Sequence, residues 1–228
     1  MTSMLETFGL FLQGAGWIFL PFLLLPFLCL LFPKVRFFKD LQRNLNVLIN
    51  GFNIWAGEVV KWLLVLMVVV TAFSVIALSI FGQSWTKVDE SVIYMHASVI
   101  MLGSAATLLA GQHVRVDIFY AKMSPRTRAL VELIGFYALM LPFCLILLWN
   151  AQTFVHLSWS SFEGSYESDG IRGVYLLKTL IPLFALMMLA QGFAIAGRAA
   201  LYLSGHSLPE LPPGIEDPFG DEHQEAGL

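Results

Sequence analysis

Five long apolar stretches make up most of this chain, and they constrain its fold more than any other feature. A helix needs roughly 20 mostly apolar residues, each rising about 1.5 Å, to cross the hydrocarbon core of a bilayer. Hydrophobic residues form 57% of the chain and charged residues only 13%, whereas a soluble domain carries about 25% charge. The sequence therefore predicts an all-α integral membrane protein with about five transmembrane helices, over residues 9–32, 62–82, 91–110, 129–149 and 174–195.

Positive charge is confined to alternate gaps between these stretches. Of the thirteen Lys and Arg residues, five lie between the first and second stretches and four between the third and fourth. The two remaining gaps hold only Lys87 and Arg172. Short basic loops stay on the cytoplasmic side of a membrane. This pattern predicts that the N-terminus lies outside the cytoplasm and the C-terminus inside it.

Residues 34–58 have a helical pattern of their own without being a span. Apolar residues recur every three or four positions, and polar residues fill the rest. We expect an amphipathic helix lying flat in the headgroup layer, although a connector packed on the protein has the same pattern. Gly51 and Gly57 would let the chain turn from it into the second span. The apolar face is Phe37, Leu41, Leu45, Leu48, Phe52 and Trp55, and the polar positions include Lys39, Arg43, Asn44, Asn46 and Asn50.

The chain divides into four segments on this evidence. Residues 1–33 form an N-terminal transmembrane helix, 34–58 the interfacial helix, and 59–205 a four-helix membrane domain. Residues 206–228 hold six acidic residues, four prolines and no Lys or Arg. Such a composition buries too little apolar surface to fold alone, so a disordered acidic tail is expected there.

Catalytic patterns are missing from the sequence. The centres of the five stretches contain no Asp, Glu, Lys or Arg, and neither a His-Glu-x-x-His zinc motif nor a glycine-rich phosphate loop occurs. We therefore predict neither an enzyme nor a bound cofactor or metal. His96 lies well inside a span and is expected to bond a neighbouring helix. With His156 it leaves one alternative, the haem-binding membrane anchor of a respiratory enzyme.

Two loops are richer in polar residues than a connection requires. The outer loop, residues 158–173, contains carboxylates among Ser, Gly and Tyr; it either receives a partner protein or is only solvated. The inner loop opens with Gly111-Gln-His-Val-Arg-Val-Asp117. Arg115 and Asp117 can pair or hold neighbouring helix ends. His113 with Asp117 supplies too few ligands for a metal site.

These residues carry a family resemblance. Gly-x-His-Val-Arg-Val-Asp after an apolar helix, followed by Tyr120 and Ser-Pro-Arg-x-Arg, resembles the DctQ-like small membrane subunit of tripartite ATP-independent periplasmic (TRAP) transporters. Asp89-Glu90, Glu167-Ser168 and Leu-Lys-x-x-Ile-Pro at 177–182 resemble further parts of the family pattern. The resemblance covers roughly residues 53–205. Two features depart from it: the additional helix at 9–32, and Leu78-Ser79 where many members have Arg-Tyr.

The resemblance implies a non-catalytic small permease subunit in the bacterial inner membrane. Its partners would be a large DctM-like membrane subunit, a periplasmic solute-binding protein and the lipid bilayer, with no nucleic acid. The large subunit would hold the Na⁺ and organic-acid sites, the substrate being a carboxylate such as a 2-oxo acid or dicarboxylate. The motif residues expected at a structural or subunit interface are Gly111, His113, Arg115 and Asp117. The residues expected to dock the periplasmic protein are Asp89, Glu90, Glu163, Glu167, Ser168, Asp169 and Arg172.

Overall fold

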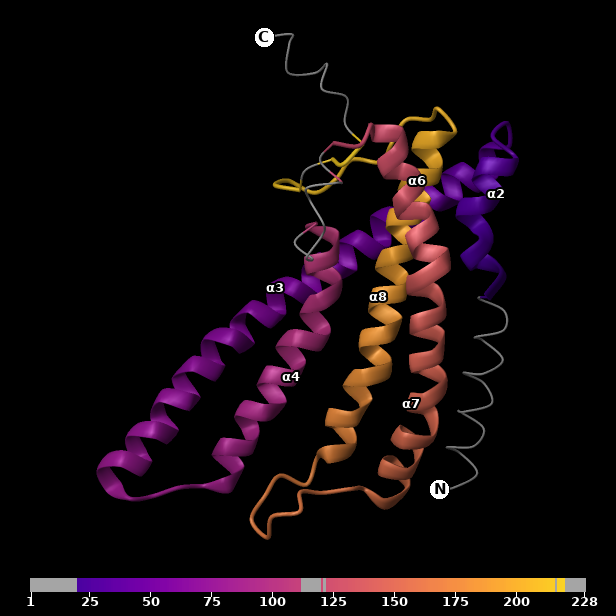
Figure 1. Cartoon of the computed structure of the whole chain (residues 1–228). Helices are drawn as coiled ribbons and strands as arrows, with labels where there is room; N and C mark the ends of the chain where they lie inside the picture. The colour runs from indigo at the N-terminus through magenta and orange to yellow at the C-terminus, as the bar shows by residue number, and fades with distance from the viewer. Residues whose placement is uncertain (1–19, 112–119, 121, 216, 220–228) are drawn as a thin grey trace, which may run out of the picture.

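The computed structural model describes residues 20–111, 120, 122–215 and 217–219, and all the regular structure in these residues is helical. The short N-terminal elements are followed by long helices that run back and forth between two ends of the molecule (Figure 1). The elements are η1 (Leu20–Leu24), α2 (Leu25–Leu31), α3 (Arg36–Phe81), α4 (Thr86–Leu109), α6 (Pro125–Gly135), η2 (Phe136–Met140), α7 (Leu141–Ser161) and α8 (Val174–Leu203).

Four of the helices are long and apolar enough to cross a membrane. They are Arg36–Phe81, Thr86–Leu109, Pro125–Ser161 and Val174–Leu203, and each contains one of the last four predicted stretches. Of the first stretch, only residues 20–32 are described, and they contain a shorter apolar helix at Phe22–Leu31. The multi-pass all-α architecture is therefore confirmed, while a fifth span remains a prediction.

The two ends of the molecule are distinct. At one end, which we call the loop end, residues 82–85 join α3 to α4 and residues 162–173 join α7 to α8. At the opposite end, which we call the tail end, α3 and α6 begin, α8 finishes, and residues 204–219 follow (Figure 1).

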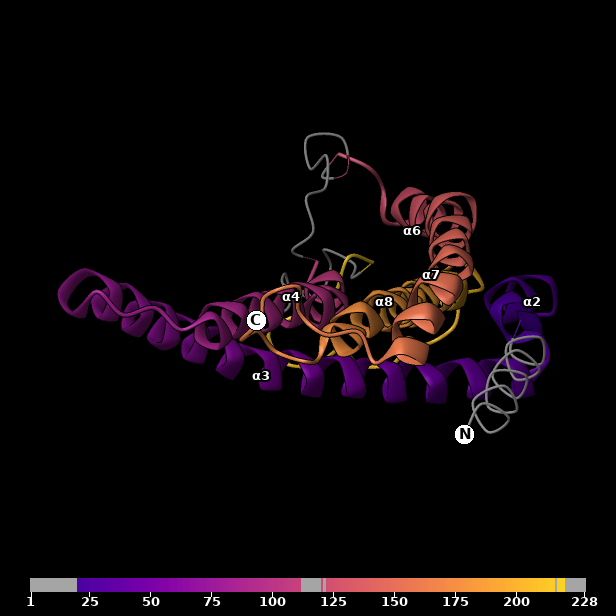
Figure 2. The ribbon, with the colours of Figure 1, turned by 90° about the horizontal axis from the view of Figure 1, so that it is seen from below.

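Helix α3 is one continuous element of 46 residues. At 1.5 Å per residue it is about 69 Å long, more than twice the hydrocarbon thickness. The turn expected at Gly51 or Gly57 is not present, because a glycine inside a helix costs only about 1 kcal/mol and the chain packs on both sides of these positions. Seen from below, α3 lies along one edge of the molecule with α4 and α8 on the same side of it (Figure 2).

Helix α8 is the centre of the bundle, since it packs against α2, α3, α4, α6 and α7. Its last three turns are almost completely buried. The main apolar core lies at this part of α8, where α2, the first half of α3 and α6 meet. Its buried members are Leu25, Cys29, Leu133, Phe136, Cys144, Leu189, Phe193, Ala196 and Ala200.

A row of buried amides joins the first half of α3 to α8. Asn53 Nδ2 donates to Gln191 Oε1 at 2.7 Å, and Gln191 Nε2 donates to Asn50 Oδ1 at 3.1 Å. One turn earlier on α3, Gln42 Nε2 donates to Asn46 Oδ1 at 2.8 Å. All five side chains are at least 91% buried. Membrane helices associate through such interhelical hydrogen bonds because lipid offers no partners.

This arrangement shows which side of residues 34–58 faces the bundle, while their flat position in the headgroup layer stays a prediction. Asn46 and Asn50, on the polar side of the sequence pattern, face α8. Of the predicted apolar face, Leu41 and Leu45 pack beside the core. The other members, Phe37, Leu48, Phe52 and Trp55, are exposed. In lipid, apolar side chains suit the outside of a helix as well as the inside, so periodicity alone does not show which side faces the protein.

Small residues set the closest helix contacts. Gly57 on α3 lies so near α4 that a Cβ added there would be 2.7 Å from the Ala106 Cβ. Gly192 and Gly197 on α8 leave room for Met140 and for the Gln42 side chain. Tight approach at small residues is the usual basis of helix packing in membranes.

Two prolines lie inside the long apolar helices, as the sequence shows. Before Pro142 the helix widens into the single π-helical turn η2, which joins α6 to α7. A proline lacks the N–H of the regular ladder and crowds the preceding turn, so a wider turn there is its local consequence. Helix α8 continues through Pro182 as one element.

Part of the predicted disordered tail has a defined place on the bundle. Phe219 is 1% exposed, packs on Ala129 and Ala199, and stacks on Tyr202 with ring centroids 5.5 Å apart. The Arg198 guanidinium is 2.5 Å from Asp217. The tail therefore differs from the disordered segment expected over its first half, because one aromatic side chain and one ion pair hold it against α6 and α8.

Replacing Gly57 by alanine tests the α3–α4 contact. Because the added methyl would overlap the Ala106 Cβ, Gly57→Ala should lower the free energy of unfolding by about 1–3 kcal/mol. Gly51 is on the same helix with nothing within 4 Å of an added Cβ. Gly51→Ala should raise stability by up to about 1 kcal/mol through helix propensity. Unfolding of each purified variant in detergent measures both; equal effects would contradict the contact.

Replacing Gln191 by leucine tests the amide row. The change removes the acceptor of Asn53 and the donor to Asn50, leaving two buried amides without a partner. We expect the free energy of unfolding to fall by about 1–3 kcal/mol. Gln152→Leu is the matched control because Gln152 is exposed on α7. If the two variants unfold alike in the same detergent, the amide row does not stabilise the fold.

Candidate docking site at the loop end

The loop between α7 and α8 has a fixed backbone. Phe162 caps α7 in the left-handed region with φ 45°, and the Glu163 N–H donates to Ser158 O at 3.0 Å. Further along, the Ser165 N–H donates to Ile171 O and the Gly170 N–H to Glu167 O, each at 3.1 Å. These bonds close residues 165–171 into a compact turn.

Glu90 of α4 holds this turn from beneath. Its carboxylate accepts from the Ser165 hydroxyl and, at 2.5 Å, from the Ile171 N–H. A Cβ at Gly170 would overlap Ser165 and approach Glu90 to 2.7 Å, so the turn needs glycine there. Of the acidic pair Asp89-Glu90, Glu90 therefore stabilises the 165–171 turn of its own chain.

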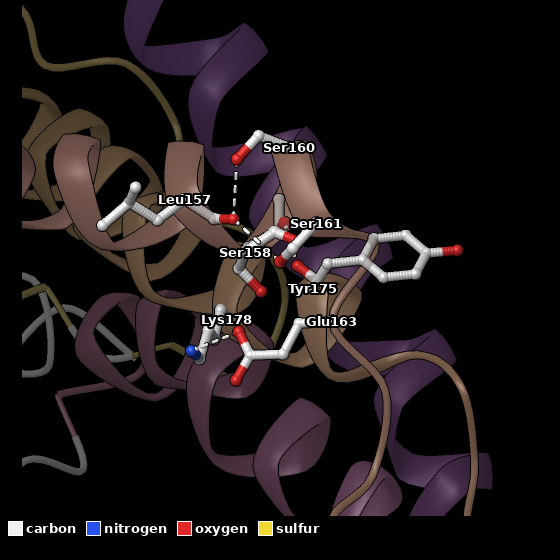
Figure 3. Close-up of polar contacts among 8 residues, drawn as sticks. Leu157, Ser158, Ser160, Ser161, Glu163, Tyr175 and Lys178 are labelled. Atoms are coloured by element: carbon white, nitrogen blue, oxygen red, sulfur yellow. Dashed lines mark hydrogen bonds and ion pairs between the residues drawn. The ribbon is translucent and has the colours of Figure 1, made fainter.

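Two ion pairs fasten the turn on either side. Lys87 Nζ lies 2.7 Å from the Asp169 carboxylate, and both side chains are well exposed. Lys178 Nζ lies 2.5 Å from the Glu163 carboxylate and 4.1 Å from the Phe154 ring centroid. Figure 3 shows the second pair, with the Ser158 hydroxyl on the same side. The hydrogen bond from Lys178 lowers the pKa of Glu163 below its ordinary value.

The turn between α3 and α4 is organised separately. The Asp89 carboxylate accepts from the Ser74 hydroxyl and from the Ser84 hydroxyl, the latter at 3.1 Å. Beside them the rings of Phe73 and Trp85 stack at 5.9 Å and 10°. Asp89 therefore closes the hairpin, with its own side chain still exposed.

What remains at the surface of the larger loop is a short run of side chains. Tyr166 is 98% exposed, and Glu167, Ser168, Asp169 and Arg172 are exposed beside it. Sequence reasoning selected the four polar residues and missed Tyr166. The available signal was an aromatic residue between serine and glutamate, in a loop where nothing apolar needs covering. An exposed tyrosine on a fixed turn can fill a partner's pocket at low entropic cost.

The structure separates the residues predicted to dock a partner into two groups. Asp89, Glu90 and Glu163 bond to other groups of this chain. Glu167, Ser168 and Arg172 lie on the outer surface with Tyr166. Asp169 belongs to both groups, since it is exposed and is paired with Lys87. Docking itself remains a prediction for all of them.

The inner-loop motif is only partly described. Gly111 ends α4 with φ +68°, a conformation that favours glycine. His113, Arg115 and Asp117 lie outside the described residues. Gly111 borders a cavity of about 460 Å³ at the tail end, whose other lining residues include Asn50, Gln191 and Arg198. Among the residues that the structure describes, no group of three or more His, Cys, Asp or Glu is placed to hold a metal ion.

A comparison with known protein families shows which family this chain belongs to. The family described as Tripartite ATP-independent periplasmic transporters, DctQ component, matches residues 67–201, which is more than half of the chain. The chain belongs to the DctQ family. It is thus a multi-pass membrane subunit of a TRAP transporter and not an enzyme. No curated protein and no solved structure matched the chain.

The match extends from the second half of α3 into the last turn of α8, and so includes the loop end and the inner-loop motif. The first half of α3 and the packed tail lie outside it. The DctQ region therefore covers the second half of α3 and most of the other three apolar helices. The first half of α3 is bound to this region through the amide row.

The pH dependence of stability tests the Glu163–Lys178 pair. The pKa of Glu163 is lowered in the folded state, so its ionised carboxylate stabilises the fold. This stabilisation is present above the unfolded-state pKa of about 4.3 and is lost as the pH falls through the folded-state pKa. Glu163→Gln should therefore lower Tm at pH 7, and the difference from the wild type should disappear in acid, well below the folded-state pKa of Glu163.

Glu167→Gln serves as the control, since Glu167 is exposed in the same loop and forms no side-chain bond to a described residue. Its Tm should follow the wild type at both pH values. A Tm difference for Glu163→Gln that persists unchanged in acid would show that the ion pair is not its source.

Proposed function

We propose that this DctQ subunit braces the large DctM-like subunit in the bacterial inner membrane and offers its loop end to the periplasmic solute-binding protein. In this proposal the large subunit carries the Na⁺ and organic-acid sites. The substrate would be a carboxylate, such as a 2-oxo acid or dicarboxylate. The chain described here contributes positioning and docking, not chemistry.

The distribution of charge supports the orientation that docking requires. Arg36 and Arg43 at the start of α3, Arg126 and Arg128 at the start of α6, and Arg198 near the end of α8 all belong to the tail end. At the loop end, Lys87 and Lys178 are paired with carboxylates. By the positive-inside rule the tail end faces the cytoplasm and the loop end the periplasm.

The single observation that carries the docking proposal is the fixed, outward Tyr166. A flexible loop would lose entropy on binding a partner, whereas this turn is already held by Glu90 and by the Lys87–Asp169 pair. Glu167 and Arg172 beside the tyrosine offer one charge of each sign to complementary groups around an apolar pocket of the partner.

The test is the affinity of the solute-binding protein for the membrane pair. Tyr166→Ala in reconstituted small and large subunits should weaken docking at least about tenfold, as loss of a tyrosine hot spot does. Uptake at low binding-protein concentration should fall with it. Phe37→Ala is the matched control, because Phe37 is 67% exposed but lies at the tail end. Unchanged docking in Tyr166→Ala, or an equal loss in both variants, would overturn the docking role.

A further inference from the structure

His96 is an exposed imidazole near the middle of a membrane-spanning helix. It lies within the 24 residues of α4 and is exposed. The sequence favoured a hydrogen bond to a neighbouring helix, but His96 has no hydrogen-bond partner among the described residues. A polar group that faces lipid without a partner is costly, so such residues normally face protein or water.

Two hydroxyl side chains on α4, Ser98 and Thr107, do not raise this problem. The Ser98 hydroxyl donates to Tyr94 O at 2.8 Å, and the Thr107 hydroxyl donates to Ser104 O at 2.8 Å. A short hydroxyl side chain can satisfy itself on its own helix in this way. The imidazole ring of His96 has no such bond among the described residues, and a polar side chain of another helix would supply one.

The remaining faces of α4 are occupied within the chain. Gly103 and Ala106 face Val60 and Gly57 of α3, and Ala105 packs with Met187 of α8. The outward face is Ile93, His96, Ile100 and Thr107, all exposed and spaced at three, four and seven residues. This set, which we call the His96 face, consists of two isoleucines, one threonine whose hydroxyl bonds its own helix, and one imidazole.

The neighbouring surface of α3 gives the contrast. Helices α3 and α4 run antiparallel in a single register. It is set by three contacts whose residue numbers have the same sum: Gly57–Ala106, Val60–Gly103 and Ser74–Asp89. This register places Met67 opposite His96, and the next residue, Val68, is 59% exposed. At the same depth, therefore, α3 presents only aliphatic surface, which suits lipid.

We propose that the His96 face of α4 packs against a membrane-spanning helix of the large subunit, from which a polar side chain hydrogen-bonds the imidazole. The proposal rests on the bracing function proposed above and assigns a surface to it. A second copy of this chain is the other possible occupant, and the crosslinking test below separates it from the large subunit. A subunit that moves a polar solute across the bilayer must itself have polar groups at membrane depth.

Photocrosslinking in the two-subunit membrane complex tests the proposal. The photoreactive residue p-benzoylphenylalanine replaces His96 in one sample and Val68 in the other. Because both positions are exposed, the bulky ring should not disturb folding. Irradiation should give an adduct with the mass of small plus large subunit from position 96 and not from position 68. An adduct between two copies of this chain, lipid adducts alone, or equal yields from both positions would overturn it.

A second measurement separates the hydrogen bond from simple packing. His96→Leu should reduce the large subunit recovered with the tagged small subunit by about threefold to tenfold, the range for one interhelical hydrogen bond in a membrane. His96→Gln, which retains donor and acceptor, should recover most of the loss. Equal yields from wild type and both variants would contradict the bond.

The two proposals fail in distinguishable ways. If the wild-type chain recovers no large subunit in mild detergent, the bracing function is wrong. If it recovers the large subunit but position 96 does not crosslink to it, the bracing function stands and only the assignment of the His96 face is wrong.

Discussion

The hydrogen bonds between Gln191 and the two asparagines of α3 fix the geometry on which the rest of the molecule depends. They hold the first half of α3 across the buried end of α8. Because α3 is unbroken, this crossing also sets the direction of its apolar half. That half positions α4 through the contacts of Val60 with Gly103 and of Ser74 with Asp89. Helix α4 in turn carries Glu90, which supports the outer turn.

The helical state of the last four apolar stretches follows from the sequence because hydropathy acts locally, whereas several helix ends, such as that of α7 at Ser161, do not. A run of apolar residues must be helical in lipid, since every backbone group has to be bonded within the segment. The orientation of α3 does not follow. In water this pattern marks an apolar face buried in the protein, whereas here the apolar Phe52 and Trp55 are exposed and the polar Asn50 is buried.

The loop end shows the same limit at the level of single side chains. Sequence alone indicates that carboxylates gather in the loops, and the DctQ resemblance identifies which of them belong to the pattern. It does not reveal that Glu90 and Asp169 find partners 75 to 82 residues away. Such pairings arise only when α4 and the α7–α8 loop are brought together, and they decide which side chains stay free for a partner. Tyr166 becomes conspicuous only after its neighbours have been bonded.

The length of α3 has a consequence for the lipid around it. A rigid rod of about 69 Å cannot stand upright in a hydrocarbon layer of about 30 Å with its whole length inside. Its angle is therefore tied to bilayer thickness. In a thicker bilayer the apolar half would rise toward the membrane normal, and the other half would swing away from the headgroups against its bonds to α8. The subunit thus favours a particular membrane thickness. Lipids that change this thickness change the tilt of α3 and strain its bonds to α8.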